Sequence, residues 1–302
     1  MIVIIGSINM DLVLEVPRMP LPGETLAGGR FHTAHGGKGA NQAVACARLS
    51  RAPAQTAMIG CVGDDAFGAA LRESLTNDGV DIRHLQQVPD TASGIAAITV
   101  DAQGQNSILL AAGANAELHP RHIDQAEQLL SRASIVVLQL EVPLATISHA
   151  IERAHALGKT VVLNPAPAAP LPSALLSKVD YLIPNEIEAG MLLGTSLDGG
   201  DMQAVQAAAI ALQAQGCRNV LITLGSRGVY AALGETCAHH AATVVDAVDS
   251  TAAGDTFIGG FVTALSEGQT PQAAIAFGQN AAAYSVARRG AQTSIPYRRQ
   301  IA

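Results

Sequence analysis

The sequence predicts an α/β protein in which helices flank a central, mostly parallel β-sheet and a small antiparallel β-sheet forms a lid. Short apolar runs such as SIVVLQL and NVLITLG alternate with helix-like segments, which is typical of parallel strands covered on both faces. Hydrophobic residues make up 49% of the 302 residues and charged residues 14%, which favours one large core. Two segments, at about 10–34 and 92–114, do not follow this alternation of strands and helices. They are expected to form the lid within a single domain spanning 1–302.

The elements of the main body follow in chain order. Buried strands are expected at 1–7, 57–63, 134–140, 160–165, 181–185 and 219–225, because each is a short apolar run. Helices are expected after the glycines at 36–37 and across 64–79, where a glycine marks the end. Residues 244–249 look like a strand placed before a helix that begins near Asp255. The uncharged run 268–287 contains four amides and a proline, so a buried helix is expected there and not a membrane span.

The lid is predicted from two segments. In DLVLEV, Leu12, Leu14 and Val16 alternate with other residues and share one face of a strand. GIAAITVDAQGQNSILLAAG is interpreted as a hairpin with its turn near Asp101 to Gly104. No linker-like stretch separates these segments from the rest, so the lid is expected to emerge from the main domain.

Composition argues against several classes of protein. The formal net charge of −7 does not suit a nucleic-acid binder. Aromatic residues are 3% of the chain, too few for a lectin surface or an RNA-stacking sheet. The four cysteines form no C-x-x-C pair, which predicts neither a zinc site nor a disulfide framework and fits a reducing cytosol. The N-terminus lacks the features of a signal peptide, so a cytoplasmic protein without a membrane partner is expected.

Polar and glycine residues gather after the predicted strands, at the carboxyl ends where open α/β sheets bind ligands. Asn9 and Asp11 follow the first strand. The others are Glu141, Asn164, Asn185, Glu188 and the turn GSRG at 225–228. One polar group after a strand means little, but five strand ends of this kind predict a shared site.

The segment DSTAAGDTF places Asp255 where a helix begins. A helix N-terminus carries unpaired N–H groups and a partial positive charge, and small residues let an anion approach the backbone. A phosphate is therefore expected on the amides of Ala253, Gly254 and Asp255. The Asp255 carboxylate would stand beside it to take a proton from an attacking hydroxyl, as phosphoryl transfer requires. The alternative is that Asp255 only complements the helix dipole.

The segment HGGKGANQ does not match the phosphate-binding loop pattern G-x-x-x-x-G-K-[ST], because Gly39 follows Lys38. It suits a small polyol instead. Gly36 and Gly37 would permit close backbone approach, Lys38 would donate hydrogen bonds, and Asn41 would both donate and accept them. The alternative is a glycine turn that serves packing alone.

Together these motifs resemble the ribokinase (PfkB) family of sugar kinases over nearly the whole chain. The matching segments, in order, are GSINMD, PGET, GGKGANQA, GDDAFG, LQLEVP, LNPAPA, PNEIEA, VLITLGSRG, DSTAAGDTF and RRGAQTSIP. The resemblance implies transfer of the γ-phosphoryl group of ATP to O5 of D-ribose. Two alternatives stay open within the fold: a kinase for 2-deoxyribose or another small sugar or nucleoside, and a sugar-binding sensor without catalysis.

The resemblance also implies roles for the residues of the sugar and phosphate sites. Asp255 is the expected general base. The expected ribose-holding residues are Asn9, Asp11, Gly37, Lys38, Asn41, Glu141 and Asp255. The expected anion hole for the γ-phosphate is made by Ala252, Ala253 and Gly254. Asn185 and Glu188 are expected to organise Mg²⁺ and the phosphates, largely through water.

The remaining implications concern the nucleotide, a monovalent cation and the partner subunit. The expected ATP-binding residues are Asn185, Thr223, Leu224, Gly225, Ser226, Arg227, Gly228, Ala253, Gly254 and Gln279. The expected ligands of an activating K⁺, several through backbone carbonyls, are Asp249, Thr251, Ser285, Arg288, Gly290 and Ser294. The family's lid covers the sugar and often pairs with a second subunit's lid, so a homodimer is expected.

Three residues depart from the family pattern or leave a choice open. Ala252 stands where the family commonly has glycine, and an alanine fits there if its φ is negative. Ser250 stands where threonine is usual. Met10 lies between two expected sugar contacts, and an inward-pointing side chain would favour a less hydroxylated sugar such as 2-deoxyribose. The alternative for Met10 is packing in the lid or the core.

Overall fold

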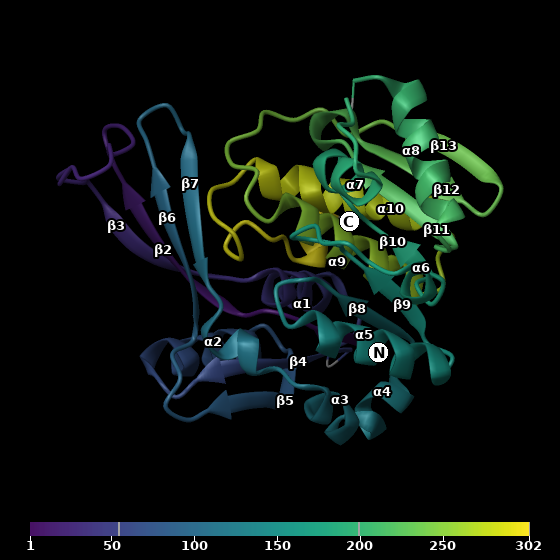
Figure 1. Ribbon diagram of the computed structural model, residues 1–302, viewed down its shortest axis with the longest axis horizontal. Helices are drawn as coiled ribbons and strands as arrows, with labels where there is room; N and C mark the ends of the chain where they lie inside the picture. Colours follow the sequence, from purple (N-terminus) through teal and green to yellow (C-terminus); the bar gives the residue numbers. More distant parts are fainter. Residues whose placement is uncertain (54, 199, 302) are drawn as a thin grey trace.

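The main body is a nine-stranded β-sheet between two layers of helices (Figure 1). The computed structural model describes residues 1–53, 55–198 and 200–301. In order across the sheet, the strands are β13 (Thr236–His240), β12 (Val229–Leu233), β11 (Asn219–Thr223), β10 (Tyr181–Leu182), β9 (Thr160–Leu163), β8 (Ile135–Leu138), β1 (Ile2–Ile5), β4 (Thr56–Gly63) and β5 (Asp81–Val88). From β11 across to β5 all pairs are parallel, and β12 and β13 add an antiparallel edge. The predicted mostly parallel sheet is confirmed.

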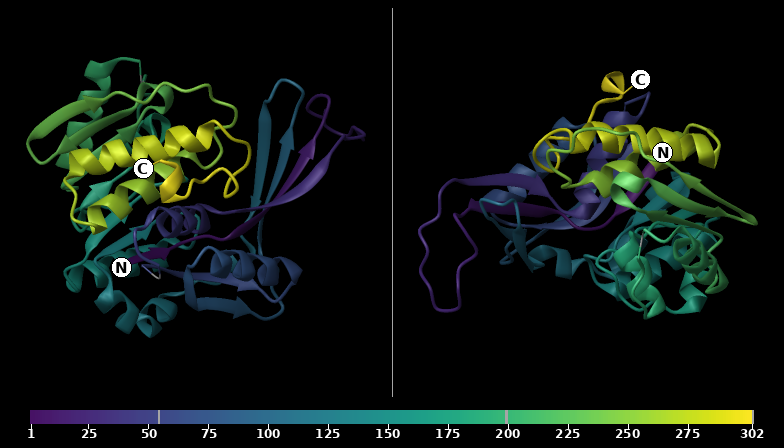
Figure 2. Two further views of the ribbon diagram at one scale, coloured as in Figure 1. Left: turned by 180° about the vertical axis from the view of Figure 1, so that it is seen from behind. Right: turned by 90° about the horizontal axis from the view of Figure 1, so that it is seen from above.

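Helices cover both faces of this sheet. One face packs against α1 (Lys38–Leu49), α2 (Ala66–Asn77), α9 (Ala253–Ser266) and α10 (Pro271–Val286), which Figure 2 shows from behind. The opposite layer holds α3 (Pro120–Gln125), α4 (Glu127–Arg132), α5 (Leu144–Ala156), α6 (Ser173–Leu176), α7 (Glu186–Leu193) and α8 (Met202–Ala214). Short 3₁₀ turns lie at η1 (Gly113–Glu117), η2 (Gly225–Arg227) and η3 (Arg298–Gln300).

The two-sided burial explains why inner strands such as β1 and β8 are apolar throughout. Successive side chains of a strand point to opposite faces of the sheet. In β1, Ile2 and Ile4 join the core under α1 and α9, whereas Val3 and Ile5 join the core under α5 and α8. A polar residue at any of these positions would be buried, so none is present.

The lid is a separate four-stranded sheet that stands away from the main body (Figure 1). Its order is β3 (Phe31–Gly36), β2 (Asn9–Glu15), β6 (Gly94–Val100) and β7 (Asn106–Ala111). The pairs β2–β3 and β6–β7 are antiparallel, as expected, but the central pair β2–β6 is parallel. β2 leaves the main body almost directly after β1, so Asn9 and Asp11 lie at the base of the lid.

Two parts of the main body differ from the sequence-based expectation. Residues 244–249 form no strand, and Val244 is 97% exposed, so the predicted strand before α9 is wrong. β5 was not predicted because its sequence, DIRHLQQV, is not apolar; as an edge strand it buries fully only Leu85. The uncharged run at 268–287 forms α10, as expected. Among the described residues, no helix has the length and apolarity needed to cross a membrane.

Candidate active site

Asp255 lies in the first turn of α9 and is held by two amides from α1. Asn41 Nδ2 donates a hydrogen bond to Asp255 Oδ2 at 3.0 Å, and Gln42 Nε2 donates one to Oδ1 at 2.9 Å. The two helices approach closely because Gly259 in α9 faces α1: a Cβ on Gly259 would lie 2.3 Å from the Cβ of Ala45. The carboxylate is 8% exposed and is fixed at both oxygens.

Gln42 was not singled out by the sequence analysis. Its side chain is fully buried, and its Nε2 also lies 3.3 Å from Oδ1 of Asn164, the residue that follows β9. Asn164 Nδ2 in turn donates to the carbonyl of Ile183 at 2.9 Å. A signal was present in the sequence, since Gln42 comes four residues after Lys38 and therefore shares its helix face.

The charged groups around Asp255 shift each other's ionisation. Burial raises the pKa of Asp255, and the Lys38 ammonium is the strongest of the groups that oppose this effect. Burial by itself lowers the pKa of Lys38, but the carboxylates of Asp255, Glu141 and Glu188 outweigh it and raise the pKa above its ordinary value. Lys38 therefore stays charged beside Asp255.

Asp11, like Asp255, is a buried carboxyl in this cluster. Burial, then the charges of Glu141 and Asp255, raise its pKa from 3.8 to about 7. Its side chain packs against the backbone at Gly36 on the neighbouring lid strand, where an added Cβ would lie 2.3 Å from Asp11 Oδ2. The glycine at 36 therefore leaves room for the carboxyl group.

Two further buried residues that the sequence analysis missed, Ser7 and Asn115, hold Glu141 and Asn9 in place. Asn115 Nδ2 donates to Asn9 Oδ1 at 2.7 Å. Ser7 Oγ donates to Glu141 Oε2 at 2.5 Å, and the Lys38 backbone N–H donates to the same oxygen at 3.2 Å. These contacts orient Asn9 and Glu141 while each keeps a second polar atom for a ligand.

Gly37 and the side-chain oxygen of Asn41 are two further features of the site near the base of the lid. Gly37 has a φ of +87°, and a Cβ there would lie 2.7 Å from the backbone nitrogen of Asn9, so the close approach of α1 to the base of the lid requires glycine. Asn41 Oδ1 is buried and has no hydrogen-bond partner among the described residues. A buried acceptor of this kind is suited to a hydroxyl donor from a ligand.

The turn before α9 contains an alanine with a positive φ. Ala252 has a φ of +58°, so the condition of a negative φ, under which an alanine would fit this turn easily, is not met. The turn gives α9 no side-chain cap, which leaves first-turn amides available, although the Ala253 N–H donates to the Ser250 carbonyl at 3.2 Å. Nothing lies within 4 Å of the Cβ position of Gly254, so the space beside this turn is open.

A polar cavity lies in front of that turn. Its lining includes Lys38, Asn164, Asn185, Glu188 and Asp255. Asn185 and Glu188 form a capping box at the start of α7: Glu188 N donates to Asn185 Oδ1 and Asn185 N donates to Glu188 Oε2, both at 2.8 Å. Their remaining polar atoms include carboxylate oxygen, the ligand type that Mg²⁺ prefers.

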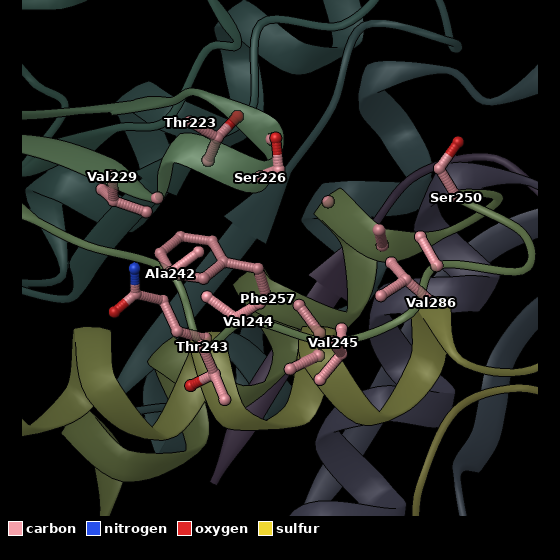
Figure 3. A pocket seen from close by; sticks show the side chains of 18 residues that line it. Thr223, Ser226, Val229, Ala242, Thr243, Val244, Val245, Ser250, Phe257 and Val286 are labelled. Atoms are coloured by element: carbon pink, nitrogen blue, oxygen red, sulfur yellow. The ribbon is translucent and has the colours of Figure 1, made fainter.

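An apolar cavity adjoins the polar one and shares Thr223, Gly225, Ser250, Ala253 and Gly254 with it. Figure 3 shows the apolar side chains around it, which come from the loop before α9 and from the two C-terminal helices: Val244, Val245, Phe257 and Val286. The exposed valines at 244–245 therefore line a cavity and do not extend the sheet. This apolar lining suits an aromatic base.

The predicted nucleotide residues do not all line these cavities. Thr223, Gly225, Ser226, Gly228, Ala253, Gly254 and Gln279 line the apolar cavity, and Asn185 lines the polar one. Leu224 is 2% exposed in the core, and the Arg227 guanidinium donates to Glu186 Oε1 at 2.7 Å, so neither side chain faces a described cavity. Gln279 Nε2 donates to the carbonyls of His240 and Ala241 at 2.9 and 3.2 Å, so it fixes the wall of the cavity.

The residues expected around a monovalent cation converge behind the same turn. Asp249 Oδ1 accepts a hydrogen bond from the Thr251 N–H at 2.9 Å, and Oδ2 accepts one from the Gly290 N–H at 2.8 Å. Burial raises the pKa of Asp249, but these hydrogen bonds outweigh it and lower the pKa. Ser285 Oγ and Ser294 Oγ lie 2.6 Å apart. An anionic carboxylate within oxygen-rich loops is chemistry that fits K⁺.

Comparisons with known proteins agree with this architecture. A model of the pfkB family carbohydrate kinases matches residues 1–298. The chain is similar to a ribokinase of Haemophilus influenzae, with 43% identity over 98% of this chain and 95% of the relative, and to a deoxyribokinase of Salmonella typhi, with 40% identity over 98% and 95%. The structure of Arabidopsis thaliana ribokinase complexed with ribose and ATP superposes with a TM-score of 0.90 and 32% identity, covering 99% of this chain and 96% of that one. The chain therefore belongs to the pfkB family of carbohydrate kinases.

Proposed function

We propose that the chain is an ATP-dependent ribokinase, which transfers the γ-phosphoryl group of ATP to O5 of D-ribose and releases D-ribose 5-phosphate and ADP. The observation that carries this proposal is the position of Asp255. Its carboxylate is held by Asn41 and Gln42 at the start of α9, where the polar cavity meets the apolar one. Ribokinases among the relatives support the choice of ribose.

The reaction needs one proton acceptor and electrostatic support for the moving phosphoryl group. The O5–H bond breaks as its proton passes to an Asp255 oxygen, and the O5 electron pair forms the bond to the γ-phosphorus. The bond from that phosphorus to its bridging oxygen breaks, and its electron pair leaves with ADP. The Lys38 ammonium and the first-turn amides of α9 lie where negative charge develops, and such preorganised donors supply a large share of the rate enhancement.

The sugar would be held at the base of the lid by Asn9, Asp11, Gly37, Lys38, Asn41 and Glu141. The base and ribose of the nucleotide would occupy the apolar cavity, with the phosphates on Ala252, Ala253 and Gly254. Met10 does not favour 2-deoxyribose, because it is 3% exposed within the core and alternates with Asn9 and Asp11 along β2. Ribose is therefore the substrate that we propose over the alternatives.

Two cations complete the proposal. Asn185 and Glu188 would hold Mg²⁺ with the ATP phosphates, and this ion neutralises charge on the phosphate oxygens. Asp249, Thr251, Ser285, Arg288, Gly290 and Ser294 would hold K⁺. Asp249 joins the turn before α9 to Gly290. A cation that orders this cluster would therefore also order the turn that forms the proposed anion hole.

The lid has the exposed apolar surface of an interface, and we propose that it pairs with the lid of a second copy. β7 is an edge strand whose Ile108, Leu109 and Leu110 are 52%, 72% and 56% exposed, and Phe31 on the opposite edge is 62% exposed. Unpaired edges and contiguous exposed apolar side chains both favour association. A cytoplasmic location is proposed on the four free thiols.

The test is an ADP-release assay with ATP over D-ribose, 2-deoxyribose, D-fructose and nucleosides, with and without K⁺. We expect the highest kcat/KM for D-ribose, with the new phosphate on O5 by ³¹P-coupled NMR, and a rise in rate when K⁺ is added. A higher kcat/KM for 2-deoxyribose or a nucleoside would replace ribose as the substrate. Sugar binding without ADP release would identify a sensor.

A further inference from the structure

Gln42 occupies a place in the site that none of the roles above accounts for. It is fully buried in α1 and touches the expected base directly, donating from Nε2 to Asp255 Oδ1 at 2.9 Å. The second carboxylate oxygen is taken by Asn41. Each oxygen thus accepts one amide N–H and keeps a lone pair for the incoming proton.

The orientation of the Gln42 amide follows from the chemistry of its neighbours. An ionised carboxylate only accepts hydrogen bonds, so Gln42 must present its NH₂ group to Asp255. Its carbonyl then points away and accepts from Gln139 Nε2 at 2.6 Å. Gln139 is fully buried and directly follows β8. One chain of amides therefore runs from the end of β8 through α1 to the start of α9.

The far end of this chain is unusual. Once Gln139 presents its NH₂ group to Gln42, its own Oε1 is buried without a hydrogen-bond partner among the described residues. The oxygen sits against Gly6, where a Cβ would lie 1.9 Å away. Leaving a buried acceptor unpaired is unfavourable for the fold. An apolar pair at 42 and 139 would avoid that penalty, so the stability of the core does not explain these two amides.

We propose that Gln42 is a positioning residue for the general base, and that Gln139 orients Gln42 for this task. The inference rests on the proposed function, because it assigns Asp255 as the base. Gln42 holds the carboxylate in one rotamer and donates to its ionised form, which favours the deprotonated state that accepts the O5 proton. Gln139 acts one step further from the reaction and touches neither substrate.

The titration of Asp255 depends on all the charged groups that face it. These are Lys38 from α1, Asp11 from β2, Glu141 after β8 and Glu188 from α7. None of them is altered when Gln42 or Gln139 is replaced. A change in the titration of Asp255 in such variants would therefore report the amide chain itself.

The experiment compares the wild-type chain with Gln42→Met and Gln139→Met, which keep a long unbranched side chain but remove the amide. The ¹³Cγ shift of Asp255, assigned by its absence in Asp255→Asn, is followed against pH without ligands. We expect the midpoint to rise by about one pH unit in Gln42→Met and by less in Gln139→Met. With D-ribose and ATP, the acidic limb of kcat/KM should move the same way, and kcat at neutral pH should fall about tenfold with the KM for D-ribose nearly unchanged.

Asn219→Leu is the matched control, because it removes a buried amide at the opposite end of β11, away from the site. It should lower stability and leave both pH curves in place. Unchanged midpoints in folded Gln42→Met and Gln139→Met would overturn the inference. If Gln42→Met does not fold, the midpoint of Gln139→Met decides the test. A wild-type chain that fails to phosphorylate D-ribose would refute the proposed function separately, since the ligand-free titration does not depend on turnover.

Discussion

At the scale of single residues, the start of α9 concentrates the groups on which the proposed chemistry depends. Asp255 offers a buried carboxylate held at both oxygens, and Lys38 opposes the effect of burial on its pKa. Asp255→Asn keeps the shape of the side chain but removes the proton acceptor. Turnover is expected to fall by roughly 10²–10⁴-fold or more, while the Kd for D-ribose changes by no more than a few-fold. ADP release and calorimetry measure the two quantities, and near-normal turnover would remove Asp255 from the role of base.

Ala252 gives a second prediction at this scale. A non-glycine residue at positive φ is strained, whereas glycine is not. Ala252→Gly should therefore raise the free energy of unfolding by about 0.5–1 kcal/mol, after the larger entropy of the unfolded chain is allowed for. Ala253→Gly is the control, because Ala253 is the first residue of α9 and is not among the residues with positive φ. This control should lose stability. Equal changes in the two variants, measured by urea unfolding, would contradict the strain at 252.

Asp11 predicts a pH dependence of stability. Its pKa is about 7 in the folded chain, against the ordinary aspartate value of 3.8, so between these values the folded chain keeps a proton that the unfolded chain has lost. The unfolded state binds fewer protons there, and stability falls as pH rises from about 4 to 7. Asp11→Asn removes this cost and should stabilise the ligand-free chain by roughly 1–3 kcal/mol at pH 8.

The measurement for Asp11 is Tm against pH for the wild type and Asp11→Asn, without ligands. The two curves should lie close together near pH 4, separate as the pH rises from about 4 to 7, and stay apart above pH 7. Parallel curves would show that Asp11 ionises normally. In the same variant D-ribose binding should weaken more than ATP binding, because Asp11 lies at the base of the lid, where we propose that the sugar binds.

At the scale of elements, the packing of α9 on α10 sets where the first turn of α9 points. A Cβ on Gly278 would lie 2.7 Å from the Phe257 carbonyl, and one on Gly260 would lie 2.9 Å from the Cα of Gly278. The two helices are therefore almost in backbone contact. This contact places the lining of the apolar cavity, which comes from both helices, in front of the β11 turn.

Two glycine-to-alanine variants separate packing from chemistry in these elements. Gly278→Ala should destabilise the fold by roughly 1–3 kcal/mol, because the helices must move apart. Gly254→Ala meets no atom within 4 Å, so it should leave stability unchanged or slightly higher, yet it should lower kcat by filling the space proposed for a phosphate. Thermal unfolding and ADP release distinguish them. A stable, fully active Gly254→Ala would move the phosphate away from this turn.

At the scale of the whole molecule, the outer strand of the lid, β7, is exposed along its whole length. Ile108 and Leu110 point to one face of β7 and Leu109 to the other, and all three are more than half exposed. Neither face of this strand is therefore covered within one chain. A second copy would cover it and would also fix how the lids close over the two sugar sites.

Leu109→Lys tests this arrangement. The side chain is 72% exposed, so the substitution should not affect folding, but it places a charge in the proposed interface. Sedimentation analysis is expected to show a dimer for the wild type and a shift toward monomer for the variant, with a raised KM for D-ribose. Ile210→Lys, on an exposed position of α8, is the control and should stay dimeric. A monomeric wild type at micromolar concentration would remove the interface.

Much of the fold was predictable, because burial on both faces leaves a direct trace in the sequence. The runs that became β1 and β8 are apolar throughout, and those of β9 and β11 are apolar except at their ends. The hairpin of β6 and β7 has its turn residues at Asp101 to Gly104. β5 was not predictable in this way, because it is an edge strand that is only partly buried and its sequence is not an apolar run. Val244 and Val245 led to the wrong prediction of a strand at 244–249. Side chains that line an apolar cavity and side chains of a buried strand are equally apolar, so the sequence does not distinguish them.

The sequence by itself determined the parallel sheet, the lid segments and the placement of Asp255 at the start of a helix, because each is a local pattern of apolar spacing, glycine and charge. Only the tertiary structure decided that Gln42 meets a carboxylate 213 residues away, that Ser7 and Asn115 hold Glu141 and Asn9, and that Ala252 takes a positive φ. Local patterns report the period and burial of a segment. Which side chains then touch depends on how closely two helices or strands pack, and that distance is set by residues far apart in the chain.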